Sequence, residues 1–132
     1  MFDLLNSERA NYHLPPLRWS SSLACAATEH TSWMDKNNSL SHDFPGEPSF
    51  ASRISGCGFH GGTTAENIGM SPDLTQQGAV DLETFMYTEP HPGDNEIGHR
   101  RNILSPSFAY VGLSVIIDQR TGSLWLTENF GG

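Results

Sequence analysis

The sequence predicts an α+β domain in which helices cover a small antiparallel sheet. Two observations carry this expectation. Apolar residues recur at helical spacing in the N-terminal two thirds of the chain, and they alternate with polar residues in the C-terminal third. The 132 residues are 36% hydrophobic and 17% charged, which is typical of a globular protein with a buried core. Because there is no internal repeat, low-complexity tract or linker, we expect residues 1–132 to form one domain.

Two helices are predicted before residue 40. The first spans about residues 2–12 and ends at Pro15 and Pro16, because a proline disfavours the helical conformation of the residue before it. The second begins after Trp19, with one of the serines at 20–22 as its N-cap. Its buried face is predicted from apolar residues at i, i+3, i+4 spacing, together with one histidine: Leu23, Ala26, Ala27, His30 and Met34.

Two further helices are predicted in the middle of the chain. A short one covers about residues 49–55 and stops at Gly56, and a longer one covers about residues 74–87. Gly78 lowers the helix propensity of the longer segment. Residues 88–95 contain two prolines and a glycine and therefore predict a loop.

Three strands are predicted around these helices. Residues 109–117 and 124–127 alternate between apolar and polar side chains, so they are expected to be half-buried strands joined by a turn at 118–122. Residues 64–68 are expected to add a third strand, because a three-stranded sheet is far more stable than an isolated hairpin.

The charge distribution argues against a nucleic-acid-binding function. The formal net charge is −8 at pH 7, and Lys36 is the only lysine. Arg100 and Arg101 alone do not make the basic patch that phosphate contacts require. No apolar run approaches the roughly 20 residues that cross a bilayer, and Met1 is followed by an amphipathic segment rather than a signal sequence. We therefore expect a soluble mature domain from which a signal peptide has been removed.

The two cysteines, Cys25 and Cys57, leave two interpretations open. They form either a disulfide between the second helix and the loop before residue 65, or two buried thiols, and no Cys-x-x-Cys spacing indicates metal or redox chemistry. A disulfide would close a loop of about thirty residues and stabilise the fold by about 3 kcal/mol in the chain-entropy model. Such a bond would suit an extracellular protein.

Three short motifs place an imidazole or a carboxylate among small or apolar neighbours. They read SHDF at 41–44, AENIG at 65–69 and GHRRNIL at 98–104. Their chemistry-bearing residues are His42, Glu66 and His99, which are 24 and 33 residues apart along the chain. Because imidazoles and carboxylates build metal and acid–base sites, the hypothesis is that folding gathers these three side chains in one solvent-open cleft.

These motifs, in this order, resemble the CAP superfamily, which contains cysteine-rich secretory proteins, insect venom allergens and plant pathogenesis-related proteins. The resemblance covers nearly the whole chain. Further matching segments are LNSER at 5–9, LPPLRW at 14–19, LACAA at 23–27, VGL at 111–113 and ENFG at 128–131. The GHRRNIL segment resembles the bacterial branch, the SCP-like extracellular proteins, more than the animal or plant branches.

The resemblance implies a three-layer α-β-α sandwich with helices on both faces of the sheet. It also implies an open cleft lined by two histidines and two glutamates, three of which match His42, Glu66 and His99. The fourth position departs from the family pattern, in which a tryptophan is followed three residues later by a glutamate, because Phe85 and Thr88 stand there instead. The candidate substitutes are Glu83, Glu89 and Glu96.

Two imidazoles and a carboxylate form a donor set for a divalent ion, zinc above all, with water completing an open coordination sphere. For Glu66 a structural role is an equal alternative to metal binding. In that role the carboxylate accepts hydrogen bonds and holds the cleft in place. For His30 we expect a core position with a backbone hydrogen-bond partner. The spacing of Glu96 and His99 would put two ligands on one helical face, but the flanking residues disfavour a helix there.

Two functions from different classes follow. The preferred one is a secreted or cell-envelope binding or interaction module, monomeric and not an enzyme, whose cleft recognises a cell-wall, carbohydrate or lipid-like ligand with a divalent metal ion. The alternative is a peptidase-like, metal-dependent hydrolase in which His42, His99 and a glutamate activate water, with Glu66 and His99 as the catalytic candidates. A serine hydrolase is disfavoured because the chain has no Gly-x-Ser-x-Gly turn.

Overall fold

The computed structural model describes residues 1–88 and 98–132 of the chain. Within them the helices are α1 (Phe2–Ala10), α2 (Ser21–Asn37), α3 (Phe50–Gly56), α4 (Gln76–Thr88) and α5 (His99–Ile103). The strands are β1 (Arg18–Trp19), β2 (Thr64–Ser71), β3 (Tyr110–Asp118) and β4 (Ser123–Gly131).

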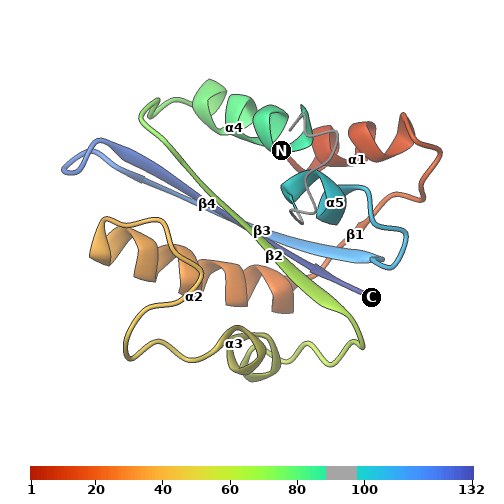
Figure 1. Ribbon diagram of the computed structural model, residues 1–132, viewed down its shortest axis with the longest axis horizontal. Coiled ribbons are helices and arrows are strands. Elements are labelled where there is room, and N and C mark those ends of the chain that lie inside the picture. Colours follow the sequence, from red (N-terminus) through yellow and green to blue (C-terminus); the bar gives the residue numbers. More distant parts are fainter. Residues whose placement is uncertain (89–97) are drawn as a thin grey trace.

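These elements form three layers around a sheet with the strand order β1-β3-β4-β2 (Figure 1). Helices α1, α4 and α5 cover one face of the sheet, and α2 and α3 cover the other. The predicted α-β-α sandwich is therefore confirmed. β2 and β3 each pair with β4 in antiparallel orientation, and β2 is an edge strand.

The sheet differs from the prediction in two respects. The two residues of β1 pair in parallel with β3, so the sheet is mixed rather than wholly antiparallel. β4 is buried along its whole length, whereas a half-buried strand was expected. It lies between β3 and β2 with helices on both faces, and a strand in that position has no side open to water.

Local signals set the helix boundaries. Ser20 is the N-cap of α2, where its Oγ accepts a hydrogen bond from the Leu23 amide at 3.2 Å, and Asn38 ends the helix in the left-handed conformation. Ser49 caps α3 in the same way. α1 ends at Ala10, two residues before its predicted end at about residue 12. α4 starts at Gln76, two residues after its predicted start at about residue 74.

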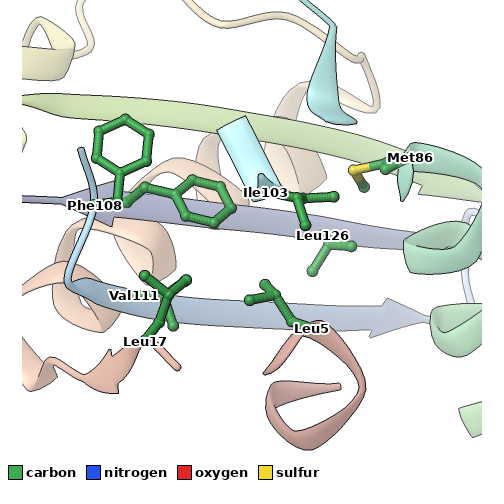
Figure 2. Close-up of a cluster of buried hydrophobic side chains, with 8 residues drawn as sticks. Leu5, Leu17, Met86, Ile103, Phe108, Val111 and Leu126 are labelled. Atoms are coloured by element: carbon green, nitrogen blue, oxygen red, sulfur yellow. The ribbon is translucent and has the colours of Figure 1, made fainter. Parts of the chain in front are cut away.

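The main hydrophobic core lies between the sheet and helices α1, α4 and α5 (Figure 2). Its fully or nearly fully buried members are Leu5, Leu17, Met86, Ile103, Phe108, Val111, Leu126 and Phe130. On the other face, α2 lies directly on β3 at Gly112, where a Cβ atom would come within 2.0 Å of the Ala24 amide nitrogen. A glycine is required there because the helix and strand backbones touch.

A disulfide and a set of buried hydrogen bonds connect the helices to one another. Cys25 and Cys57 form a disulfide that joins α2 to the end of α3, so the first of the two interpretations of these cysteines is the correct one. The buried Arg9 of α1 donates hydrogen bonds to the carbonyl oxygens of Ile103 at 2.8 Å and Ser105 at 2.9 Å. Arg9 therefore attaches α1 to the C-terminal end of α5.

Candidate functional site

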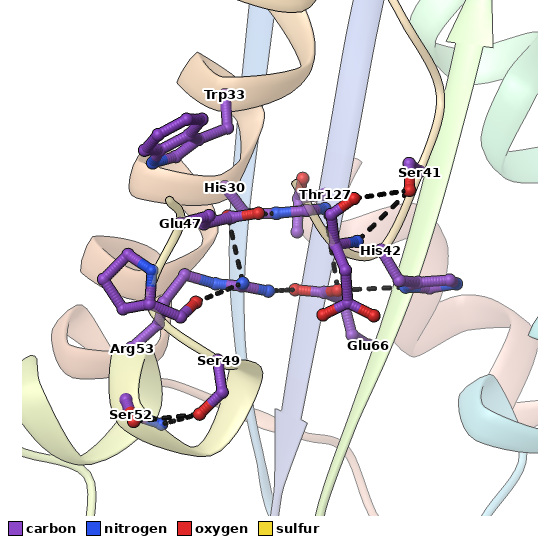
Figure 3. A network of polar contacts seen from close by, with 12 residues as sticks. His30, Trp33, Ser41, His42, Glu47, Ser49, Ser52, Arg53, Glu66 and Thr127 are labelled. Atoms are coloured by element: carbon purple, nitrogen blue, oxygen red, sulfur yellow. Dashed lines mark hydrogen bonds and ion pairs between the residues drawn. The ribbon is translucent and has the colours of Figure 1, made fainter. Parts of the chain in front are cut away.

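The structure brings together two of the three predicted site residues. His42 lies in the segment between α2 and α3, and Glu66 lies on the edge strand β2. His42 Nδ1 is 3.0 Å from Glu66 Oε1 (Figure 3). The imidazole is 56% exposed, whereas the carboxylate is only 5% exposed. An exposed imidazole is thus held by a buried carboxylate.

Glu66 is in turn held by Arg53 of α3. Arg53 Nη2 donates to Glu66 Oε2 at 2.9 Å, and Nη1 forms a second ion pair with Glu47 Oε1, also at 2.9 Å. Nη1 also donates to the Pro48 carbonyl at 3.1 Å. The Arg53 side chain is fully buried, so both charge-assisted contacts are shielded from water.

His30 completes this network, but with a different partner from the one expected. Its Nδ1 is 2.6 Å from Glu47 Oε1, so the hydrogen bond is to a carboxylate and not to the backbone. Its Nε2 has no hydrogen bond and lies 3.7 Å from Glu66 Oε1. The burial expected from the apolar face of α2 is confirmed, since His30 is 0% exposed.

The sequence contained no signal for two members of the network, Arg53 and Glu47. Glu47 stands in a Pro-Gly-Glu-Pro stretch that has the composition of a surface loop, and Arg53 lies between serines in the short helix predicted at 49–55. Both are buried because the segment after α2 folds back over that helix, where Glu47 contacts His30, 17 positions earlier in the chain, and Arg53 pairs with Glu47.

The two ring nitrogens of His42 have different surroundings. Nδ1 faces Glu66, while Nε2 has no hydrogen-bond partner in the part of the chain that the structure describes. A carboxylate on one imidazole nitrogen fixes the tautomer and raises the basicity of the other, an arrangement typical of histidines that bind metal ions. The chemistry of the donor set therefore fits a cation at Nε2, with Glu66 as the orienting group.

His99 is the first residue of α5, where the flanking residues had argued against a helix. Asn67, the residue after Glu66, donates to the His99 carbonyl at 3.3 Å and accepts from Asn102 Nδ2 at 2.8 Å. These bonds tie α5 to the edge strand that carries Glu66. The gathering of the His99 imidazole with His42 and Glu66 in one cleft stays a prediction.

The three candidates for the fourth position have different outcomes. Glu89 and Glu96 lie outside the described residues. Glu83 is fully buried on α4, and the charge of Glu128 acts on its carboxyl group. Successive strand residues point to opposite faces, and Glu128 is adjacent to Asn129, the cross-strand partner of Glu66. Glu83 therefore lies on the other face of the sheet and does not accompany Glu66.

Burial changes the acidity of this second group of glutamates. Desolvation, with the nearby Glu128 charge, raises the pKa of Glu83 to about 12. Desolvation also raises the pKa of Glu8, to about 7. Both pKa values are raised because burial favours the neutral acid over the carboxylate.

Another group of potential ligands does not fit a metal ion. Ligand atoms of Cys25, Glu29 and Cys57 lie within 4.8 Å of one another in the described part of the chain. The two sulfurs are joined in the disulfide, and it is the thiolate that binds metals.

Comparison with known proteins identifies the family. The sequence profile of the cysteine-rich secretory protein family, CAP, matches residues 2–130. The chain belongs to this family. The profile covers all nine helices and strands that the structure describes except the last residue of β4, so the CAP match and the fold refer to the same unit.

Bacterial CAP proteins are among the similar sequences and structures. The YkwD protein of Bacillus subtilis is 28% identical over 130 residues, which is 98% of this chain and 45% of that protein. An extracellular protein containing a SCP domain from Bacillus anthracis is also 28% identical, with a TM-score of 0.74 over 98% of this chain and 38% of that one. The CAP domain therefore spans less than half the length of these two relatives.

A second similar structure supports the fold alone. An outer surface protein from Borrelia burgdorferi has a TM-score of 0.76 at 15% identity, over 98% of this chain and 87% of that one. Among the helices described here, none combines the length and apolar character needed to cross a membrane.

Proposed function

We propose that this CAP domain is an extracellular binding module that contacts its ligand through His42. The ligand is of the cell-wall, carbohydrate or lipid-like class, and a divalent cation, zinc above all, takes part in binding it. The observation that carries this proposal is the anchored imidazole: His42 is exposed, and its Nδ1 lies 3.0 Å from a buried Glu66 that is paired with Arg53.

An anchored imidazole is suited to recognition because its orientation is set before the ligand arrives. The buried ion pairs hold Glu66 in place, and Glu66 holds the ring of His42. A side chain ordered in advance loses less conformational entropy on binding than a mobile one. The two buried ion pairs on Arg53 thus support an interaction surface and not only the fold.

The role of Glu66 follows from the same contacts. Both of its oxygens already accept hydrogen bonds, one from Arg53 and one from His42. Glu66 is proposed to orient the ring of His42, while His42 Nε2 is the cation ligand and His99 is a second one. Water would complete the coordination, as in an open zinc site.

The extracellular location rests on two observations. The relatives include proteins described as extracellular and as an outer surface protein. The disulfide between Cys25 and Cys57 is of a type that persists in oxidising compartments.

Isothermal titration of the purified protein with zinc tests the proposal. We expect His42→Ala to lower zinc affinity at least tenfold and Glu66→Gln to lower it by about 10- to 100-fold, the range found when an outer-shell partner of a ligand is removed. His60→Ala is the matched control, since His60 is an exposed histidine outside the network, and should bind zinc like the wild type. Equal affinity in the wild type and His42→Ala would refute the role of His42.

A second assay distinguishes binding from hydrolysis. The same variants are incubated with peptidoglycan, phospholipid vesicles and peptide and ester substrates, with and without zinc. Retention on peptidoglycan or vesicles that is lost in His42→Ala supports the binding module. Zinc-dependent turnover that disappears in both Glu66→Gln and His99→Ala would replace it by the hydrolase.

A further inference from the structure

The outer edge of β3 is open along most of its length. β1 pairs with β3 only at Tyr110 and Val111, whereas β3 continues to Asp118. On its other side β3 pairs with β4 over its whole length. The stretch from Gly112 to Asp118 therefore has a neighbouring strand on one side only.

Backbone groups without a partner line this open edge. The Ser20 amide donates to the Val111 carbonyl at 2.9 Å, so the backbone groups of Val111 point away from β4. Successive residues of a strand present these groups to opposite sides, so those of Leu113, Val115 and Ile117 point to the same edge as those of Val111. Within residues 1–88 and 98–132, no segment other than β3 itself forms a backbone hydrogen bond with these three residues along this edge.

The helices leave the edge uncovered at Val115 and Ile117. These side chains are 39% and 43% exposed, and the turn between β3 and β4 lies at the end of the sheet away from α1 (Figure 1). On the other face α2 touches β3 at Gly112, but its Thr31 hydroxyl reaches Thr127 of β4, to which it donates at 2.8 Å. α2 therefore crosses from β3 toward β4 along its length.

The sequence does not protect this edge against pairing. Natural proteins protect an open edge with a charged side chain, a proline or a bulge, because such an edge pairs readily with another strand. The segment GLSVII at 112–117 contains no charged residue and no proline, and its register with β4 is continuous. The edge strand β2, in contrast, carries the charged Glu66, which is bonded to His42.

We propose that the open edge of β3 is a dimerisation surface, on which β3 of a second copy of this chain pairs in antiparallel orientation and places Val115 opposite Ile117 of the second copy. The sequence led us to expect a monomer, because an open strand edge appears only once the sheet order is known. The dimer goes beyond the function proposed for His42 and does not depend on it.

The edge is complementary to itself. Val115 and Ile117 lie on either side of Ile116, so a two-fold axis at Ile116 places each of them opposite the other. Opposed residues whose backbone groups face each other exchange both hydrogen bonds, and their side chains lie on the same face of the joined sheet. Apolar side chains therefore meet apolar ones. The net charge of −8 opposes contact between copies elsewhere, but this segment adds no charge to the interface.

The end of β1 selects this register. Ser20 follows β1 directly and occupies the edge beside Gly112, because its amide is bonded to β3. A two-fold axis at Val115 would bring Asp118 of the second copy to the position that Ser20 occupies. The axis at Ile116 moves Asp118 two residues away from it, so both chains fit along the edge.

The dimer would present two candidate sites on one face of a continuous sheet. Across it the strands run β2-β4-β3-β3-β4-β2, so the two β2 strands, with Glu66 and His42, lie at opposite ends. The axis is perpendicular to the sheet, so both His42 side chains lie on the same face. For a polymeric ligand, which rests on the function proposed for His42, the second contact becomes intramolecular and raises the apparent affinity.

Sedimentation equilibrium of the disulfide-intact protein tests the dimer. Between about 10 μM and about 1 mM, we expect the average mass to rise from the 14.5 kDa of one chain toward twice that value, as for a weak interface. A mass that stays at 14.5 kDa over this range would overturn the proposal.

Two double variants test the register. Val115→Lys/Ile117→Lys places like charges opposite each other, so we expect the dissociation constant of the dimer to rise at least about tenfold. Val115→Lys/Ile117→Glu is the matched control, since it places opposite charges across the same axis and should dimerise at least about tenfold more tightly than the first variant. Equal dimerisation of the two variants would contradict this register. Both should bind zinc like the wild type, so failure of the dimer and failure of the His42 site are distinguishable.

Amide hydrogen exchange of the wild type gives a readout that needs no variant. The amides of Val115 and Ile117 are open in a single chain and bonded in the dimer, so their exchange should slow as the protein concentration rises. The amide of Cys57 is bonded to the Arg53 carbonyl within one chain and should exchange at a constant rate. Exchange at Val115 and Ile117 that does not depend on concentration would also overturn the proposal.

Discussion

Replacing Arg53 by methionine tests whether the buried ion-pair network supports the fold. The substitution keeps a long apolar side chain but removes both 2.9 Å ion pairs. Glu47 and Glu66, which are 1% and 5% exposed, would remain buried without their cation. Removing one partner from a buried pair costs about 3–5 kcal/mol, because the remaining charge is not solvated.

This loss converts into a large shift of the melting temperature. With an unfolding entropy of about 2.1 cal/mol/K per residue, the 132-residue chain has about 0.28 kcal/mol/K. A loss of 3–5 kcal/mol therefore lowers Tm by roughly 11–18 °C. Differential scanning calorimetry of the oxidised protein measures this directly.

Arg120→Met is the matched control. Arg120 pairs with Asp118 at 2.7 Å, but its side chain is 81% exposed, so we expect a loss within about 1 kcal/mol. Adding Glu47→Gln and Glu66→Gln to Arg53→Met should recover part of the loss, since no buried charge is then left unpaired. A shift in Arg53→Met no larger than that in Arg120→Met, or no recovery in the triple variant, would refute the reasoning.

Three further predictions concern the fold and the site. Gly112→Ala should lower the free energy of unfolding in urea by about 3 kcal/mol or more, because the added Cβ would overlap the α2 backbone. The control is Gly56→Ala, whose Cβ would meet no atom within 4 Å, and its free energy of unfolding should change by no more than about 1 kcal/mol. Equal losses in the two variants would contradict the close contact at Gly112. The double variant Cys25→Ser/Cys57→Ser lacks the disulfide, and its free energy of unfolding should be lower by about 3–4 kcal/mol for a 32-residue separation. An unchanged unfolding midpoint would show that the disulfide does not constrain the unfolded chain. Zinc affinity should fall between pH 7.5 and pH 5, because a protonated imidazole has no lone pair to donate, and calorimetry should show a smaller fall in His42→Ala.

The helices were predictable because their signals are local. The N-cap serine predicted for α2 and the apolar spacing on its buried face act within a few residues, and the structure confirms both. β1 was missed because two residues are too few for a period-two pattern, and its pairing with β3 spans more than 90 positions. The burial of β4 depends on its central place in the sheet, which alternation within the strand does not encode.

The site was predictable only in part, for a related reason. The motifs marked His42 and Glu66, which the structure places 3.0 Å apart. They did not mark Arg53 or Glu47, whose importance comes from burial and pairing and not from a sequence pattern. Glu83 was one of three candidates for the fourth cleft position, and the sequence of α4 did not show which face of the sheet that helix would cover.

A crystal structure of the protein soaked in zinc tests the central claim most directly, that His42 is an anchored contact for a divalent cation. We predict an anomalous peak about 2.0–2.1 Å from His42 Nε2, with Nδ1 still bonded to Glu66. Zinc on other histidines alone, or a His42 ring turned away from Glu66 with the metal bound, would contradict the account.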